Sequence, residues 1–197
     1  MEKETIAPKD FNLSKVKLLP TGGVNVEYQL TRVIENEASV LERKETCSRD
    51  VHPDLRALFD DLRSIVARVV GMTSFLTLLE TDEFKKVPES VKNVAREYAI
   101  GLLDRIDVRG VAWSGTEDNE GVVVTAVLET PNGLKTCVNT PRIKLAQISF
   151  GFEEELETIV DRIKEEVFAY LYKGKQAQLS LFGESEEDTD QFPGDQE

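Results

Sequence analysis

The sequence predicts an α+β fold in which two antiparallel three-stranded meanders are each followed by an amphipathic helix. Three observations lead to this prediction. Stretches of alternating apolar and polar residues, which are typical of half-buried strands, occur in two groups of three. Each group precedes a longer segment whose apolar residues recur every three or four positions, as on one face of a helix. The chain then ends in a polar, strongly acidic stretch that is typical of a disordered tail.

The first meander is expected in the N-terminal part of the chain. Its clearest strand begins at Val24, because Val24, Val26, Tyr28 and Leu30 alternate with polar residues. The flanking segments alternate less regularly, and the motifs PTGG and NEA mark the turns between them. The three strands are therefore expected at 15–18, 24–31 and 39–47.

Two helices are expected after the first meander. Pro53 suits the first position of a helix, and Gly71 is a natural stop for it. A second helix is expected over 88–103, opening with Pro88. The apolar face of the first helix comprises Leu55, Leu58, Phe59, Leu62, Ile65, Val66, Val69 and Val70.

The pattern then starts again. A strong strand is expected over GVVVTAVLET, and Asn132-Gly133 favours a hairpin turn into the strand that follows. The segment after this second meander is expected to be irregular up to residue 151, and a helix is expected over 152–174. The three strands of this meander are expected at 105–113, 121–130 and 134–140.

These boundaries predict a flexible N-terminus over 1–11, one α+β domain over 12–174 and a disordered tail over 175–197. The domain divides into halves at 12–103 and 104–174, and KETC in one half aligns loosely with LKTC in the other. An internal duplication and a common α+β layout explain this order equally well. In both cases, amphipathic helices are expected to cover one face of the antiparallel strands.

The charge of the chain argues against duplex DNA as a direct partner. The formal net charge is −13, and the segment 184–197 holds seven acids and no base, so about half of the excess lies at this end. A duplex binder normally shows a basic face, because phosphate contacts supply most of its affinity. No segment of this sequence predicts such a face.

The sequence predicts a cytoplasmic protein that does not cross a membrane. No apolar run approaches the ~20 residues that a transmembrane helix needs, and the first residues lack the layout of a signal peptide. Cys47 and Cys137 are expected to be reduced, buried thiols, because disulfides are rare in the cytosol.

No catalytic or cofactor site is predicted. His52 is the only histidine, and its place at a helix start favours a role beside the cap. Adjacent acids such as Asp60 and Asp61 point in different directions on a helix, so they are expected to be solvated. Two cysteines and one histidine cannot complete a four-ligand zinc site, and no glycine-rich phosphate loop is present. We therefore expect no enzyme, metal or cofactor; a deep polar pocket around Trp113, Asn139 and His52 would indicate the opposite.

A short apolar stretch, QLSLF, stands in the polar segment beyond the last helix. Such a stretch either packs on its own core or docks in a partner's groove, with a leucine and an aromatic residue as buried anchors. QLSLF resembles the pentapeptide by which bacterial polymerases, clamp loaders and mismatch-repair proteins bind the sliding clamp of DNA replication. The resemblance implies that Gln178 is the polar anchor, that Leu179 and Ser180 are connectors, and that Leu181 and Phe182 fill a hydrophobic cleft.

The rest of the chain resembles, more diffusely, small uncharacterised proteins of bacteriophages and prophages that are encoded among replication and recombination genes. The likeness comprises HPDL at 52–55, the strand pair VRGVAWSG and GVVVTAVL, the segment 139–141, and a final helix leading to the tail motif. That family has no established activity. The resemblance therefore implies a context for the protein and no mechanism.

We expect, on these grounds, a non-enzymatic accessory protein of phage-type DNA replication or recombination that docks on the bacterial sliding clamp through 178–182. Self-association of the body would add avidity. One alternative is a single-stranded-DNA-binding or annealing module with an acidic protein-interaction tail that includes Phe192. Such a module would need an exposed basic and aromatic sheet face. Its candidate residues are Tyr28, Trp113, Arg32 and Arg43. A further alternative is an acidic decoy that mimics DNA or inhibits a host factor such as the clamp.

Overall fold

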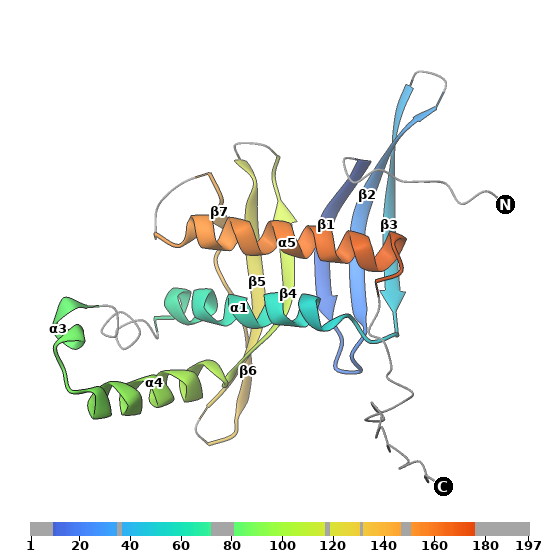
Figure 1. The fold of residues 1–197 in the computed structure, drawn as a ribbon. Helices are drawn as coiled ribbons and strands as arrows, with labels where there is room; N and C mark the ends of the chain where they lie inside the picture. The colour runs from blue at the N-terminus through green and yellow to red at the C-terminus, as the bar shows by residue number, and fades with distance from the viewer. Residues whose placement is uncertain are drawn as a thin grey trace, which may run out of the picture.

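The fold is an antiparallel β-sheet with two long helices lying crosswise over the same face (Figure 1). The fold class is therefore α+β, as predicted. The computed structural model describes residues 10–34, 37–71, 81–116, 119–130, 132–146 and 151–175. The motif at 178–182 and the acidic end of the chain lie outside these residues.

The two expected meanders form one continuous sheet. The order across it is β3-β2-β1-β4-β5-β6, the short β7 pairs with β5, and every pairing is antiparallel. The pairing of β1 with β4, centred on Val16 opposite Val111, joins the two meanders. The strands are β1 (Phe11–Leu18), β2 (Val24–Ile34), β3 (Glu37–Cys47), β4 (Ile106–Ser114), β5 (Gly121–Glu129), β6 (Lys135–Asn139) and β7 (Ile143–Lys144).

The helices follow the predicted periodicity closely. The long helices α1, α4 and α5 begin and end within about two residues of the predicted bounds. Between α1 and α4 lies α3, a single short helical turn. No helix in the described part of the chain is long and apolar enough to cross a membrane. The helices are α1 (Pro53–Val69), α3 (Asp82–Lys85), α4 (Glu89–Leu103) and α5 (Glu153–Tyr172).

The alternation of β2 explains how the core is built. Val24, Val26, Tyr28 and Leu30 are at most 2% exposed and face the helices, while the intervening polar residues face the other side of the sheet. Each such apolar side chain contributes about 1.5–3 kcal/mol when fully buried. The helical side chains of the same core include Leu58, Leu62 and Ile65 of α1 and Val160, Ile163 and Val167 of α5.

Helix α4 is mostly exposed, unlike α1 and α5. Ala99 is its one buried residue, whereas Val94, Tyr98 and Ile100 are each more than half exposed. Asp104, just beyond its end, is bound by Arg63 of α1. Amphipathic spacing predicted the helix correctly, but the spacing contains no information on which surface, if any, covers the apolar face.

Several expectations of the sequence need correction. β1 begins at Phe11, because the Phe11 ring packs 4.9 Å from the ring of Tyr28 and extends the strand into the segment expected to be flexible. β7 lies in a segment expected to be irregular, since two residues are too few to show a period. Both cysteines are free as expected, but Cys137 is exposed and Cys47 is only half-buried. Cys137 is exposed because it faces the side of the sheet opposite the helices.

Candidate functional site

The described chain ends close to the predicted docking motif. Residues 178–182 themselves lie outside the described residues, so the structure gives them no position. Helix α5 ends at Tyr172, and Lys175 is the last described residue. We call residues 172–175 the tail root, because any docking motif in the tail is presented from there.

Tyr172 attaches the tail root to the sheet. Its hydroxyl donates a 2.8 Å hydrogen bond to the hydroxyl of Tyr28 on β2, which in turn donates to the carboxylate of Glu45 on β3. The rings of Phe11 and Phe168 lie 6.0 and 5.2 Å from that of Tyr172. Burial and the hydrogen bond to Glu45 raise the pKa of Tyr28 well above its usual range, so its hydroxyl stays protonated and remains a donor.

Lys175 attaches the tail root to α1. Its ammonium lies 2.7 Å from Oδ2 of Asp54 and 2.9 Å from Oε1 of Glu166, and its backbone N–H donates to the carbonyl of Ala169. The hydrogen bond between Lys175 and Asp54 raises the pKa of Lys175 and lowers that of Asp54. Gly174, at φ +71°, supplies the left-handed turn after α5 that brings Lys175 back toward the body.

His52 acts as the N-cap of α1, close to the role expected for it. Its Nδ1 accepts a 3.3 Å hydrogen bond from the backbone N–H of Asp54. Trp113 faces the helices, where Lys164 lies 5.8 Å from its ring centre. Asn139 lies on the opposite face of the sheet and accepts a hydrogen bond from Thr125. The structure therefore does not gather His52, Trp113 and Asn139 into one pocket.

The two aromatic residues considered for a base-stacking face are buried. Tyr28 is 2% exposed and Trp113 is 9% exposed, and both face the helices. Arg43 pairs with Tyr28 in register, so it shares that face, and the side chain of Arg32 lies outside the described part of the structure. Stacking on bases requires exposed ring faces. Tyr28 and Trp113 thus do not form a binding groove for single strands.

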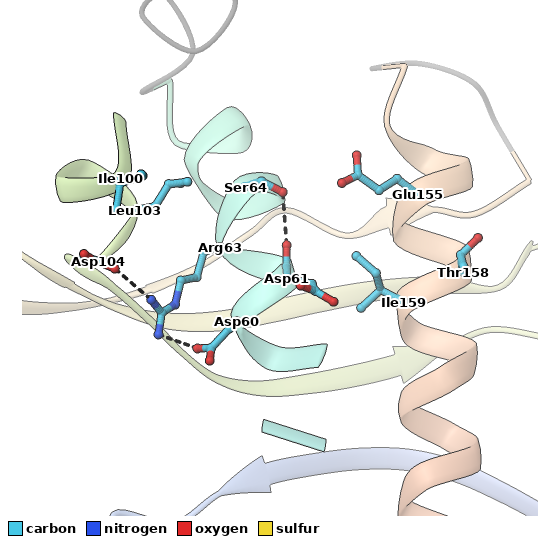
Figure 2. Close-up of a pocket in the computed structure, with 10 residues that line it drawn as sticks. All are labelled: Asp60, Asp61, Arg63, Ser64, Ile100, Leu103, Asp104, Glu155, Thr158 and Ile159. Carbon is cyan, nitrogen blue, oxygen red and sulfur yellow. Dashed lines mark hydrogen bonds and ion pairs between the residues drawn. The ribbon is translucent and has the colours of Figure 1, made fainter. Parts of the chain in front are cut away.

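A second candidate site is an open cleft of about 610 Å³ between α1, α4 and α5 (Figure 2). Apolar side chains line part of it, including Leu103 of α4 and Ile159 of α5. Figure 2 shows Arg63 of α1 lying between two carboxylates, and it forms ion pairs with both Asp60 and Asp104. These pairs are largely exposed to water, so they order the rim of the cleft more than they stabilise the fold.

The cleft combines an acidic rim with an apolar wall. Glu155 on its α5 side is bound by Arg68 at 3.6 Å, and Asp61 of α1 adds a further carboxylate to the rim. Across the same described residues, no three His, Cys, Asp or Glu side chains are grouped as metal ligands. Sequence reasoning missed this cleft because its walls come from three helices that are far apart in the chain.

The Lys175 contacts were also missed, and for the same physical reason. Asp54 and Lys175 are 121 positions apart, so no local pattern links them.

The chain matches no protein-family model, no curated protein and no solved structure. Any functional assignment therefore depends on the residues of this chain.

Proposed function

We propose that this protein is a non-enzymatic accessory factor of phage-type DNA replication or recombination that docks on the bacterial sliding clamp through residues 178–182. The observation that carries the proposal is QLSLF itself, which resembles the clamp-binding pentapeptide at every position. In this proposal Gln178 makes hydrogen bonds in a small polar site. Leu181 and Phe182 are the buried anchors that supply most of the binding energy.

The described core is formed by the strands and helices of the body. The apolar faces of β1, β2, β4 and β5 are covered by α1 and α5, and the buried side chains of these elements form one cluster. The aromatic contacts at the end of α5 are likewise made by residues of the body. In this proposal the leucines and the phenylalanine of the motif contact a partner and not the core.

Surface plasmon resonance with an immobilised bacterial sliding clamp tests the proposal. A five-residue motif buries little area, so a Kd in the micromolar range, about −8 kcal/mol, is expected. The double variant Leu181→Ala/Phe182→Ala should weaken binding ~100-fold or more, because it removes both anchors. The matched control Phe192→Ala removes an aromatic residue from the same tail and should bind like the wild type.

The outcomes separate the proposal from its rivals. Absence of wild-type binding, or equal losses in the double variant and the Phe192→Ala control, would overturn clamp docking through the motif. Clamp-dependent DNA synthesis in the presence of the protein then distinguishes an accessory factor, which leaves synthesis intact, from a decoy that inhibits it. Binding of single-stranded DNA by a variant that cannot bind the clamp would instead favour the annealing alternative.

A further inference from the structure

The length of the tether between body and motif is the observation from which this inference starts. Only Gln176 and Ala177 separate Lys175 from Gln178. Each residue spans at most ~3.6 Å, so the Cα atoms of Lys175 and Gln178 are no more than ~11 Å apart. A partner that holds Gln178 must therefore lie within about this distance of the tail root.

The body is much larger than the tether. A folded body of this length has a radius of gyration of about 15 Å, which corresponds to a sphere of ~20 Å radius. The tail root is also fixed to that body at several points: through the Tyr172 hydroxyl, through the two carboxylates that bind Lys175, and through the Lys175 backbone. The body therefore cannot swing away from a partner that holds the motif.

The surface that faces such a partner is formed by residues around Lys175. Asp54 and Glu166 bind Lys175 directly, and His52 lies 3.2 Å from the same Asp54 oxygen that Lys175 contacts. The loop before α1 joins this surface because the hydroxyl of Tyr170 donates to the carbonyl of Arg49. We call Arg49, His52, Asp54, Glu166 and Lys175 the root surface; it carries charges of both signs.

We propose that the root surface is a second contact with the sliding clamp, made by the folded body when residues 178–182 are docked. This inference rests on the proposed function and adds to it that the body is seated on the clamp and is not held at a distance by a flexible linker. The mixed charges of the root surface suit a polar contact of the kind found at the rim of an interface. Such a contact limits the orientations of the body on the clamp.

Hydroxyl-radical footprinting read by mass spectrometry tests the second contact. His52 is a suitable reporter, because it is the only histidine of the chain, is reactive toward radicals, and has a side chain that is 32% exposed. Leu134 is the matched control, since it is 66% exposed and adjoins β6, at the sheet edge opposite β3. Adding the clamp to the full-length protein should reduce oxidation of His52 at least threefold and leave Leu134 unchanged.

A variant with a longer linker shows whether the short linker causes the protection of His52. Ten Gly and Ser residues inserted between Lys175 and Gln176 allow the body to move away while the motif stays intact. In this variant clamp binding should persist and the protection of His52 should be lost. Wild-type binding with no protection of His52 would overturn the second contact and leave the docking proposal intact. Protection of His52 that survives the insertion would overturn the short linker as the cause of the contact. Loss of wild-type clamp binding would overturn both.

Discussion

The turn between β1 and β2 offers a test of how closely the chain packs against the end of β3. Gly23 lies directly against β3, and a Cβ atom placed on it would lie 2.1 Å from the backbone carbonyl oxygen of Cys47. That distance is more than 1 Å shorter than an ordinary contact, and the atom it meets is backbone. The neighbouring Gly22 carbonyl accepts hydrogen bonds from Val51 and Arg56, which lead into α1.

The substitution Gly23→Ala should therefore separate the ends of β2 and β3. Separation of the strands breaks the backbone hydrogen bonds of the first residue pair, Val24 opposite Cys47. Each hydrogen bond lost lowers the free energy of unfolding by about 0.5–1.5 kcal/mol. Repacking around Val24, which is fully buried, adds about 1–3 kcal/mol. We expect a total loss of ~3 kcal/mol in the free energy of unfolding.

Urea unfolding followed by circular dichroism measures this loss. With a slope of ~2 kcal/mol per molar urea, the midpoint should fall by about 1.5 M. The control is Gly133→Ala, where φ is +75° but no atom lies within 4 Å of the new Cβ. Its backbone strain should cost only ~1 kcal/mol, or about 0.5 M. Equal midpoints for the two variants would refute the steric reasoning, because the clash at Gly23 would then cost no more than the backbone strain at Gly133.

Three further predictions follow from the same structure. Leu62→Ala removes a fully buried side chain of α1 and should lower the free energy of unfolding by about 2–5 kcal/mol in a single urea transition; two separate transitions would contradict it. Because Lys175 lowers the pKa of Asp54, their contact should stabilise the fold above about pH 4 and be lost as the pH falls through the lowered pKa. Asp54→Asn should therefore weaken the dependence of thermal stability on pH below pH 4. Thermal melts at several pH values measure this dependence, and an unchanged pH dependence in the variant would refute the prediction. Finally, exposed Cys137 should react with a thiol reagent ~10-fold faster than Cys47, whose pKa is raised by burial; single-cysteine variants with equal rates would contradict this.

The local periodicity of the sequence predicted most of the helices and strands, and it failed at particular residues. The 3.6-residue spacing placed α1 correctly, and the alternation of β2 already put Tyr28 on the same side as Val24 and Val26. The same alternation could have excluded Tyr28 from an exposed stacking face. The period failed at β7, where two residues hold no repeat, and it could not show that β1 pairs with β4, because that pairing is non-local.

The candidate sites were less predictable than the fold. The cleft of Figure 2 depends on how α1, α4 and α5 are arranged. The sequence shows the acidic residues of these helices, but it does not show that the helices lie next to one another. The contact of Lys175 with Asp54 is similarly a product of tertiary structure. QLSLF is the reverse case: a linear motif is readable from sequence, and its docking role stays a prediction because 178–182 lie outside the described residues.

The two halves of the sheet depend on each other through their helices. α1 follows the first meander, yet it packs against β4 of the second. α5 follows the second meander, and along its length it contacts both: Lys164 binds Glu120 before β5, whereas Tyr172 binds Tyr28 of β2. Neither half can therefore bury its own helix fully when alone, and the tail root forms only when both are assembled. A free peptide of residues 176–197 carries the motif without the root surface, so the ratio of its Kd to that of the whole protein measures what the assembled fold adds to docking.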